Sequence, residues 1–413
     1  MNLIEDLNAR GLIEHHSADL EKIFGEKRTL YIGTDPTADS LHVGHLTWLF
    51  LLRRLGLAGH SLIVIVGGGT GMIGDPREAG ERSLLDDATL KKNTKALQKQ
   101  IQSILGSLKF RMVDNAEWLK KVSLIDFLRD TGKYFTVNDL IKRELIKRRL
   151  DTPNESISYT EFTYSLLQAY DYRMLNQKYG CDLQLGGSDQ WTNVLSGVDL
   201  IRKKDSKEVY AVAFPLVTDA AGKKFGKSEG NAIWLDPNKT SPFQFYQFWL
   251  GSDDASASKY LKIFTFLPLQ EIDAMVELHR RNPERRQAQK MLAREVTTLV
   301  HGASAAKAAE RFTDVLYGDA QFDSLSASER DALFAAVPST TLVAGTQNSL
   351  LDVLTTNGFV ASKSEGRRLI DAKGIKLNGE QVEADRALTA SDFQNGLAIL
   401  QKGKSEKLLV RQK

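Results

Sequence analysis

Two histidines three positions apart are the first residues of this chain whose spacing suggests chemistry. His42 and His45 stand in the tetrapeptide HVGH, at the predicted start of a helix. Because residues i and i+3 share a helix face, both imidazoles would lie beside the positive end of the helix dipole. Gly44 leaves bare backbone between them, against which a flat ring can lie. The tetrapeptide predicts a site for a nucleotide with phosphates, whereas HxxH lacks the spacing and glutamate of a zinc site.

A lysine cluster about 180 residues further on, GKKFGKS, offers cations for such phosphates. The cluster approaches the P-loop pattern GxxxxGK[ST], which requires a glycine where Ala221 stands. Gly222 is one residue too near, and the EGNAIWLDP that follows is a poor helix for a phosphate loop. This argues against a P-loop nucleotide hydrolase. Lys224 and Lys227 remain candidate phosphate ligands, with an exposed basic turn as the alternative.

A third segment, residues 69–74 (GTGMIG), matches the dinucleotide-binding pattern GxGxxG after a predicted strand. Asp86 and Asp87 lie near the distance at which a ribose-binding acid is expected. However, Asp75 and Pro76 follow the last glycine at once, and ten charged, loop-like residues come next. Since the pattern needs a helix that opens within the glycines, a tight turn is the better interpretation. A nicotinamide-dependent dehydrogenase is therefore the weaker alternative.

The elements that must position these residues alternate between strands and helices over residues 1–236. Residues 29–33 (TLYIG) and 62–66 (LIVIV) predict strands on either side of a helix at 41–55. Further helices are expected at 91–108, 164–175 and 191–201, with further strands at 182–185 and 209–217. Strand, helix and strand in this order indicate a Rossmann-like α/β domain with a parallel sheet.

The rest of the chain changes character. Residues 237–318 predict an α-helical domain, whose first helix begins at the N-cap Ser241 and Pro242. Residues 319–348, rich in Ser, Ala, Thr and Asp, predict a linker. The tail, 349–413, predicts a helix at 363–372 and a hairpin about an Asn378–Gly379 turn, which is a small α+β domain.

The composition of the 413 residues is that of an ordinary soluble globular protein, with 42% hydrophobic and 26% charged residues. No apolar run approaches the ~20 residues that cross a bilayer. The acidic start is unlike a signal peptide, and the single Cys181 cannot form an intrachain disulfide. We therefore expect a cytoplasmic protein. The net charge of +3 implies that any nucleic-acid surface is local.

Taken together, HVGH and KFGKS resemble the HIGH and KMSKS signatures of class I aminoacyl-tRNA synthetases. KFGKS departs from the common form at Phe225 and Gly226 but keeps both lysines. Segments that resemble the bacterial tyrosyl-tRNA synthetase family, in its order, are YIGTDPTADSLHVGHL, GGGTGMIGDP, YSLLQAYDY, LQLGGSDQW and PLVTDAAGKKFGKS. The resemblance covers residues 29–240, and the helical region and tail also fit. Tryptophanyl-tRNA synthetases are the nearest sister family.

The resemblance implies that the chain activates L-tyrosine with ATP, giving tyrosyl-adenylate and pyrophosphate, and then transfers tyrosine to the 3′ end of tRNA(Tyr). Such chemistry needs positioning and charge stabilisation more than a nucleophilic side chain. The catalytic residues implied are Thr37, His42, His45, Lys224 and Lys227. Mg²⁺ is expected with ATP, without a dedicated protein metal site. Arg77 and Arg82 lie where the family has basic residues, in a loop that is one residue shorter here.

The same resemblance assigns residues to the substrates. Tyr31 and Asp171 would meet the phenol hydroxyl of tyrosine, and Gln190 its carboxylate. The ammonium group would be met by Asp75, Tyr164 and Gln168. The nucleotide would lie against Asp35, Gly44, Gly187, Asp189, Lys224 and Lys227. Asn115 is expected behind the pocket. Tyr164, Gln168 and Asp171 share one helix face by their i, i+4, i+7 spacing, so a buried polar face that satisfies itself is the alternative.

Local basic clusters are the candidates for contacts with tRNA. Arg202 and Lys203 form one and residues 142–149 (KRELIKRR) another, although each is more often a solvated helix face. The tail resembles the small RNA-binding domain shared with a ribosomal small-subunit protein of the S-four type, with Arg367 and Arg368 on its helix. Residues 401–413 add five cations against one acid; a frayed terminus is the alternative. The family also implies a homodimer.

Another class of function remains open besides the dehydrogenase. A non-catalytic RNA-binding protein could retain a synthetase fold, although the intact HVGH and both loop lysines disfavour it. Exchange of pyrophosphate into ATP that depends on tyrosine separates all three.

Overall fold

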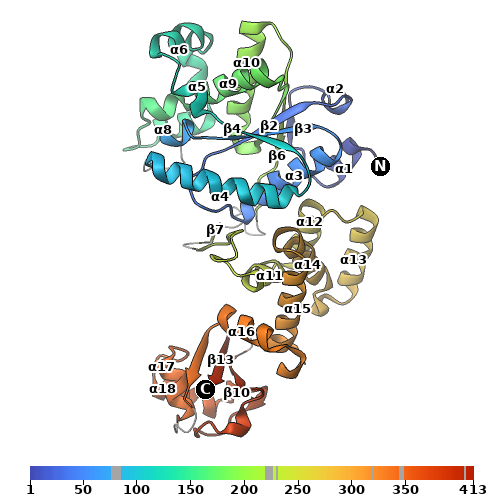
Figure 1. The fold of residues 1–413 in the computed structure, drawn as a ribbon, viewed down its shortest axis with the longest axis vertical. Coiled ribbons are helices and arrows are strands. Elements are labelled where there is room, and N and C mark those ends of the chain that lie inside the picture. Colours follow the sequence, from blue (N-terminus) through green and yellow to red (C-terminus); the bar gives the residue numbers. More distant parts are fainter. Residues whose placement is uncertain (76–84, 219–226, 229–230, 319, 344–347, 404–405) are drawn as a thin grey trace. The chain divides into compact units, whose positions relative to one another are not determined.

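The computed structural model describes residues 1–75, 85–218, 227–228, 231–318, 320–343, 348–403 and 406–413 (Figure 1). The chain splits into two compact units. One consists of Met1–Thr240 and Ser252–Leu292, and the other of Ser241–Gly251 and Ala293–Lys413. Among the described residues, no helix combines the length and the apolarity that crossing a bilayer requires.

The first unit is built on a six-stranded sheet in the order β1-β6-β5-β2-β3-β4. All neighbours are parallel except β1, which pairs antiparallel with β6. The strands are β1 (His15–His16), β2 (Thr29–Thr34), β3 (Ser61–Val66), β4 (Phe110–Asp114), β5 (Leu183–Gly187) and β6 (Tyr210–Phe214). The strand order reverses between β2 and β5. In doubly wound sheets, ligands bind at such a switch point, outside the carboxyl ends of the strands.

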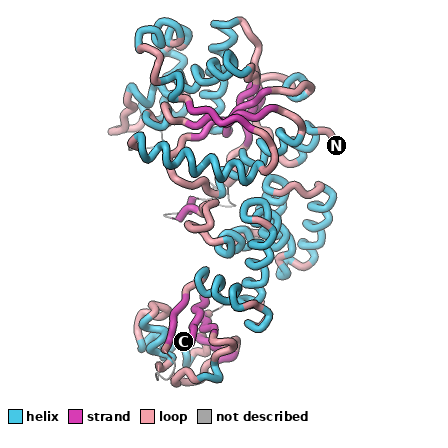
Figure 2. Tube along the Cα trace, viewed as in Figure 1, coloured by secondary structure: helices cyan, strands magenta, loops and turns pink. Residues whose placement is uncertain are grey.

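Helices cover both faces of this sheet (Figures 1 and 2). On one face α3 (Leu46–Leu57) packs with α4 (Asp87–Leu105), and on the other α9 (Tyr159–Tyr179) packs with α10 (Trp191–Asp205). The shorter helices of this part are α1 (Leu3–Ala9), α2 (Leu20–Phe24), α5 (Ala116–Leu119), α6 (Leu124–Asp130), α7 (Val137–Leu140) and α8 (Glu144–Asp151). In the same unit, α12 (Asp254–Phe264) and α13 (Leu269–Arg281) follow later in the chain, and the unit boundary falls within α14 (Gln287–His301).

Local sequence explains where these elements begin and end. From Leu62 on, every residue of β3 is buried, as expected for a strand covered on both faces. Ser158 and Glu161 form a reciprocal capping box at the start of α9, and Gly180 ends the helix in the left-handed conformation with φ 65°. Ser241 caps α11 (Pro242–Leu250), with Pro242 in its first turn. The predicted helix start at Ser241 is thus confirmed.

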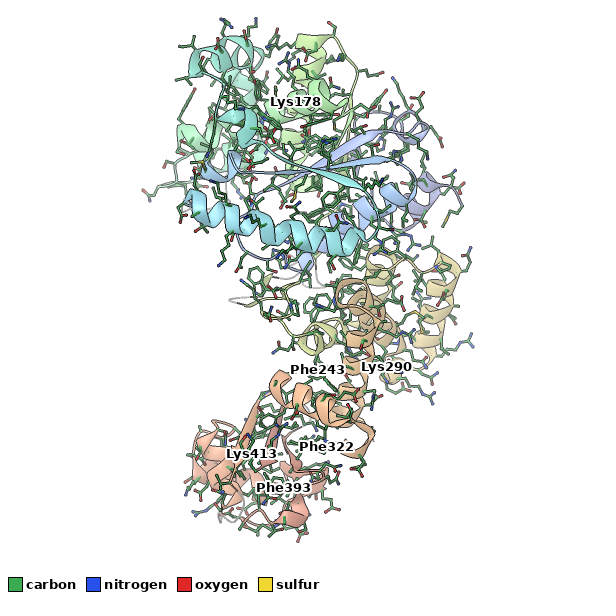
Figure 3. The ribbon with its side chains drawn as sticks, viewed as in Figure 1. Lys178, Phe243, Lys290, Phe322, Phe393 and Lys413 are labelled. Atoms are coloured by element: carbon green, nitrogen blue, oxygen red, sulfur yellow. The ribbon has the colours of Figure 1, made fainter. Side chains whose placement is uncertain are left out.

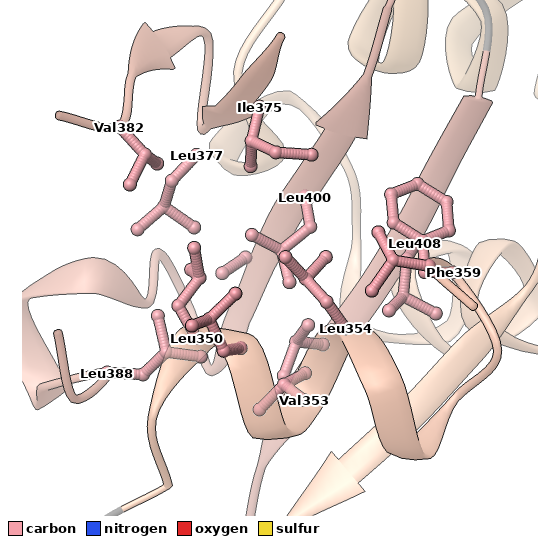
Figure 4. Close-up of a cluster of buried hydrophobic side chains, with 14 of the residues drawn as sticks. Leu350, Val353, Leu354, Phe359, Ile375, Leu377, Val382, Leu388, Leu400 and Leu408 are labelled. Atoms are coloured by element: carbon pink, nitrogen blue, oxygen red, sulfur yellow. The ribbon is translucent and has the colours of Figure 1, made fainter. Parts of the chain in front are cut away.

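The second unit contains helices and a separate five-stranded sheet. α11 packs against α15 (Ala303–Tyr317). The sheet has the order β11-β10-β12-β13-β9. The strands are β9 (Ser339–Leu342), β10 (Ile375–Leu377), β11 (Glu380–Gln381), β12 (Leu397–Lys402) and β13 (Glu406–Gln412). The helices of this part of the chain are α16 (Ala327–Ala336), α17 (Leu350–Thr356) and α18 (Lys363–Asp371). Leu350 and Leu354 of α17 pack with Leu400 of β12 in a fully buried core (Figure 4).

The two strands predicted within residues 29–66 and the hairpin of the tail are confirmed. The helix predicted for 41–55 begins only at Leu46, because the backbone of His42 is extended and residues 43–45 form a 3₁₀ turn. Asn378 and Gly379 both have positive φ (51° and 88°), as a two-residue hairpin turn of the primed type requires. The strand predicted for 209–217 is shorter, because β6 ends at Phe214. The Rossmann-like description of the first unit also holds, since its parallel strands follow the doubly wound order.

The structure departs from the predicted linker at 319–348. This stretch contains α16 and β9, and β9 pairs parallel with β13 at the other end of the tail. The guanidinium of Arg411 lies 4.1 Å from the ring centre of Phe334 and pairs with Asp331 at 2.8 Å. The partner strand is some seventy residues away, so no local pattern marks β9. The tail sheet therefore begins before residue 349, and the final residues form a strand rather than a frayed end.

Candidate active site

The HVGH segment opens the helical stretch after β2. His42 has extended backbone and caps η1 (Val43–His45), where its Nδ1 accepts the backbone N–H of Gly44 at 3.1 Å. The Nδ1 of His45 accepts the backbone N–H of His42 at 3.1 Å, and the two ring centres are 4.1 Å apart. Because both Nδ1 atoms accept, the neutral rings carry their protons on Nε2. Both side chains are therefore N–H donors at a helix N-terminus.

The chain just after the lysine cluster lies against HVGH. Trp234 forms an antiparallel bridge with His42, and the N–H of Val43 donates to the carbonyl of Ile233 at 2.9 Å. Lys227 lies in β7 (Lys227–Ser228), which pairs with β8 (Asn231–Ala232) directly before this contact. Backbone hydrogen bonds thus bring the segment that follows the lysine cluster against HVGH.

Asp171 is a buried carboxylate near the carboxyl ends of the strands. It is 4% exposed on α9, where Trp118 Nε1 donates to its Oδ1 at 2.7 Å and Asn115 Nδ2 to its Oδ2 at 2.9 Å. Burial raises the pKa of Asp171 to about 7, and the two hydrogen bonds oppose that rise. The ammonium of Lys178 lies 5.0 Å from the Trp118 ring centre (Figure 3). The donors that hold Asp171 are neutral, so its charge is uncompensated by direct pairing among the described residues.

Tyr31 brings an unsatisfied hydroxyl to the same region. The residue is 1% exposed on β2, and its hydroxyl has no hydrogen-bond partner among the described residues. Burial raises its pKa well above the usual value, and the nearby charges of Cys181 and Asp171 add to the effect. A buried polar group without a partner costs about 1–3 kcal/mol. The arrangement fits a ligand hydroxyl that contacts Tyr31 and Asp171.

A second carboxylate, Asp35, follows β2 directly. It accepts hydrogen bonds from the hydroxyls of Thr70 at 3.0 Å and Tyr164 at 3.1 Å. At Gly67 a Cβ atom would come within 1.9 Å of Asp35 Oδ1, so a side chain there would displace this carboxylate from its present position.

The glycine-rich segment is held by the side chain of Asn115, which also donates to Asp171. Its Oδ1 accepts the N–H of Gly69 at 2.7 Å, and its Nδ2 donates to Thr70 at 2.9 Å. The segment forms η2 (Thr70–Met72), and no α-helix opens within its glycines. The dinucleotide interpretation is thereby excluded for this turn.

Gln190 and Asp75 meet at the end of β5. Gln190 lies in η4 (Ser188–Gln190), directly after Gly187, and its Nε2 donates to Asp75 Oδ2 at 2.9 Å. The exposed Asp189 lies in the same turn. An amide donor and a carboxylate side by side suit the carboxylate and ammonium of an amino acid.

Of the remaining predicted residues, some are described by the structure and others lie outside the described residues. Thr37 is exposed just after β2, and Gln168 is half-buried on α9. Lys224, Arg77 and Arg82 lie outside the described residues. Among the residues that the structure describes, no cluster of three His, Cys, Asp or Glu side chains could hold a metal.

The basic clusters are only partly available to RNA. Arg149, in the cluster 142–149, is 4% exposed and pairs with Glu161 at 2.7 Å, so its assignment to a solvated or RNA-facing surface is wrong. Arg202 is exposed and pairs with Asp199 at 2.7 Å, and Lys203 is exposed beside it. Arg367 and Arg368 are both exposed on α18.

Two contributors to the site escaped sequence reasoning. Trp118 and Thr70 contact Asp171 and Asp35, the two buried or half-buried acids of the pocket. Trp118 stands one helical turn after Asn115, on α5, which was the only local signal for it. Thr70 lies inside the glycine-rich segment, whose sequence pattern is defined by its glycines and gives no role to the threonine.

Comparison with known proteins gives a consistent family. A model described as tRNA synthetases class I (W and Y) matches residues 25–318, and one described as Tyrosine--tRNA ligase SYY-like C-terminal domain matches residues 329–410. The tyrosine–tRNA ligase of Roseiflexus castenholzii is 44% identical over 421 residues, covering 99% of each chain. Tyrosine–tRNA ligase 1 of Vibrio parahaemolyticus is 43% identical over 417 residues, covering 99% of this chain and 98% of that protein.

A solved structure agrees. The C-terminally truncated mitochondrial tyrosyl-tRNA synthetase of Aspergillus nidulans matches with a TM-score of 0.68 and 32% identity, over 76% of this chain and 94% of that chain. A tyrosyl-tRNA synthetase of Archaeoglobus fulgidus, at 18% identity and a TM-score of 0.57, shares the fold.

The raised pKa of Asp171 predicts a pH-dependent stability. The folded pKa of about 7 lies above the ordinary 3.8, so the wild type should lose stability relative to Asp171→Asn as pH rises from 4 to 7. The loss should reach at most about 4 kcal/mol, since each pKa unit is worth ~1.36 kcal/mol, and stay constant above pH 8. Urea unfolding of both proteins across this range measures it. Asp273→Asn, at an exposed aspartate, is the control; a difference between wild type and Asp171→Asn that does not change with pH would contradict the burial argument.

Proposed function

The chain belongs to the class I tRNA synthetases of the tryptophan and tyrosine branch and is a tyrosine–tRNA ligase, and we propose how its residues divide that work. It joins L-tyrosine to AMP with release of pyrophosphate, and then transfers tyrosine to the 3′ end of its tRNA. The observation that carries the amino-acid assignment is the buried hydroxyl of Tyr31, which has no hydrogen-bond partner in the described part of the chain, in the region of the buried Asp171 carboxylate. Pyrophosphate exchange into ATP that requires tyrosine is the direct test.

Tyrosine is selected through its phenol hydroxyl. A carboxylate has about four lone-pair directions, and Asn115 and Trp118 use two of those on Asp171. The substrate O–H donates to the same carboxylate, and the phenol oxygen accepts from Tyr31. Phenylalanine offers neither bond and leaves both groups buried without a partner.

The activation step is positional and electrostatic. Gln190 meets the carboxylate of tyrosine, and Asp75, Tyr164 and Gln168 surround its ammonium group. The carboxylate attacks the α-phosphate of ATP and the bond to pyrophosphate breaks. Charge that develops on the leaving pyrophosphate is met by the Nε2–H of His42, by Thr37, and by Lys224 and Lys227. His45 lies toward the ribose.

ATP is bound through backbone as much as through side chains. Gly44 leaves room for the flat base at the helix N-terminus, and Gly187, Asp189 and Asp35 lie toward the ribose at the carboxyl ends of β5 and β2. We expect Mg²⁺ to be held by the phosphates of ATP, where it would neutralise part of their charge.

Two further proposals concern macromolecular partners. The tail unit binds tRNA through the exposed Arg367 and Arg368 of α18, and Arg202 and Lys203 contribute beside the catalytic sheet. The protein works as a cytoplasmic homodimer. Of the thirteen large hydrophobic side chains found exposed among the described residues, seven lie between 124 and 159. They are Leu124, Ile125, Leu128, Val137, Ile141, Leu150 and Tyr159. A second copy would cover this face.

Selection for the hydroxyl predicts that the chain forms the adenylate with tyrosine and far less with phenylalanine. Tyr31→Phe removes one of the two partners, so the preference for tyrosine over phenylalanine should fall by about tenfold, the equivalent of one hydrogen bond. Exchange rates with both amino acids at subsaturating concentration measure this. Equal rates in the wild type would refute the pocket assignment.

The loop lysines should act in the transition state. Lys224→Ala or Lys227→Ala should slow adenylate formation roughly 100-fold while leaving tyrosine affinity nearly unchanged. Single-turnover kinetics and equilibrium binding of tyrosine separate the two effects. The exposed Lys290 (Figure 3) serves as the control in Lys290→Ala. A large loss of tyrosine binding with an unchanged chemical rate would contradict the role.

If the exposed apolar side chains between residues 124 and 159 form the dimer interface, a charged side chain introduced among them should weaken the dimer. Ile125, which is 70% exposed on α6, should pack against the second copy, so Ile125→Glu should raise the dimer dissociation constant at least about tenfold. Sedimentation equilibrium measures it, with Val343→Glu, at an exposed valine of the other unit, as the control. A monomeric wild type, or an Ile125→Glu protein that dimerises like it, argues against this face.

The arginines of α18 should serve tRNA and not adenylate chemistry. The double variant Arg367→Ala/Arg368→Ala should leave tyrosine-dependent pyrophosphate exchange unchanged and weaken tRNA charging at low tRNA concentration. The slope of log K against log salt should become shallower by about 0.7–0.9 for each phosphate that the variant no longer neutralises. Arg280→Ala, at an exposed arginine of α13, is the control. Full charging with an unchanged salt slope would show that α18 is not the tRNA-binding element.

A further inference from the structure

A line of side-chain hydrogen bonds runs from Arg143 to the proposed tyrosine site. Arg143 Nη1 donates to Asn193 Oδ1 at 3.0 Å, and Asn193 Nδ2 donates to Gln190 Oε1 at 3.0 Å. Gln190 Nε2 donates in turn to Asp75 Oδ2 at 2.9 Å. Arg143 stands at the start of α8, whereas Asn193 lies in the first turn of α10. We call these four residues the Arg143 relay.

The direction of every bond in the relay is fixed by its two ends. A guanidinium has only donors, and an ionised carboxylate has only acceptors. Asn193 must therefore turn its oxygen toward Arg143 and its amino group toward Gln190. Gln190 must in turn direct its oxygen toward Asn193 and its amino group toward Asp75. An amide alone could present either end, but these two amides cannot flip without breaking two bonds each.

A further hydrogen bond and partial burial hold the Arg143 side chain in this position. Its Nη2 donates to Ser196 Oγ at 2.7 Å, and Ser196 is 5% exposed on α10. Burial lowers the pKa of Arg143 to about 10, with the charge of Asp139 opposing the shift, so the guanidinium remains protonated at neutral pH. The relay thus starts from a permanent cation that is held away from bulk water.

We propose that Arg143 is a positioning residue for the amino-acid substrate. By fixing Gln190 with its amino group toward Asp75, it leaves the second N–H of that amide to donate to the carboxylate of tyrosine. In the opposite orientation the amide oxygen would face that carboxylate and repel it. Asp75 stays an acceptor for the ammonium group. This role rests on the function proposed above: the guanidinium of Arg143 is the group that makes Gln190 selective for an α-carboxylate.

The test compares two ligands that differ only in the carboxylate. L-Tyrosine and tyramine share the phenol and the ammonium group, but tyramine has no carboxylate. Arg143→Met removes the donor that orients the relay, and Asn193→Asp removes the donor to Gln190. In either full-length variant the dissociation constant for L-tyrosine should rise about tenfold, the equivalent of a hydrogen bond to a charged group, while that for tyramine changes less than about twofold. Titration calorimetry on the protein measures both constants.

Matched variants separate orientation from packing. Ser196→Ala removes the other partner of Arg143 without touching the relay, so the ratio of the two dissociation constants should remain that of the wild type. Arg143→Lys keeps a cationic donor and should restore part of the ratio. Thermal unfolding of each variant establishes that it is folded, and if Arg143→Met is not, Asn193→Asp decides the question.

Two results would overturn the proposal. One is an equal loss of affinity for tyrosine and tyramine, which would mean general disruption of the pocket. The other is an unchanged affinity for both. Wild-type exchange of pyrophosphate in the presence of tyrosine is measured alongside: its absence would refute the proposed function, whereas its presence with an unaltered ratio in the variants would refute the relay alone.

Discussion

The catalytic unit is organised around one buried carboxylate, Asp171, which is held by two neutral donors. Placing a charge there is unfavourable, as its pKa of about 7 shows, and the indole of Trp118 and the amide of Asn115 recover only part of the cost. Those donors come from α5, directly after β4, while Asp171 comes from α9. The cluster therefore exists only if the helix and the strand end are seated correctly against each other. Burial of a carboxylate without a cationic partner among the described residues is costly, which sets Asp171 apart from the apolar core around it.

The strand order supplies the remaining geometry. Since the sheet reverses between β2 and β5, the connections after these two strands diverge, and ligands of doubly wound sheets bind at such a point. Asp35 follows β2 directly, and Gln190 follows β5 within a few residues. HVGH follows β2 within a few residues, which places its donors at the same edge. The bridge between His42 and Trp234 brings the segment that follows the lysine cluster to HVGH.

Sequence alone was sufficient where the pattern is local. The i, i+4, i+7 spacing of Tyr164, Gln168 and Asp171 identified one face of α9, and the Asn–Gly pair of the tail identified a hairpin. It was insufficient where a residue's partner lies far along the chain. Arg149 looked like part of a solvated cluster because Glu161, which buries it, is on another helix. β9 was missed because its strand partner is β13, and Arg143 because its role depends on three side chains from separate elements.

The tail shows why counting charges predicts an RNA surface poorly. Lys402 pairs with Glu406, and Arg411 pairs with Asp331 while its guanidinium lies over the Phe334 ring. These two cations stabilise the sheet, so part of the positive charge of residues 401–413 is used within the fold. Arg367 and Arg368 remain exposed, next to each other on one helix, whereas the groups assigned to tyrosine are spread from Tyr31 to Gln190. The phosphates of a nucleic acid can be bound by neighbouring cationic side chains on a single helix. A single amino acid needs donors that converge on it from several directions, and only the tertiary fold can bring those together.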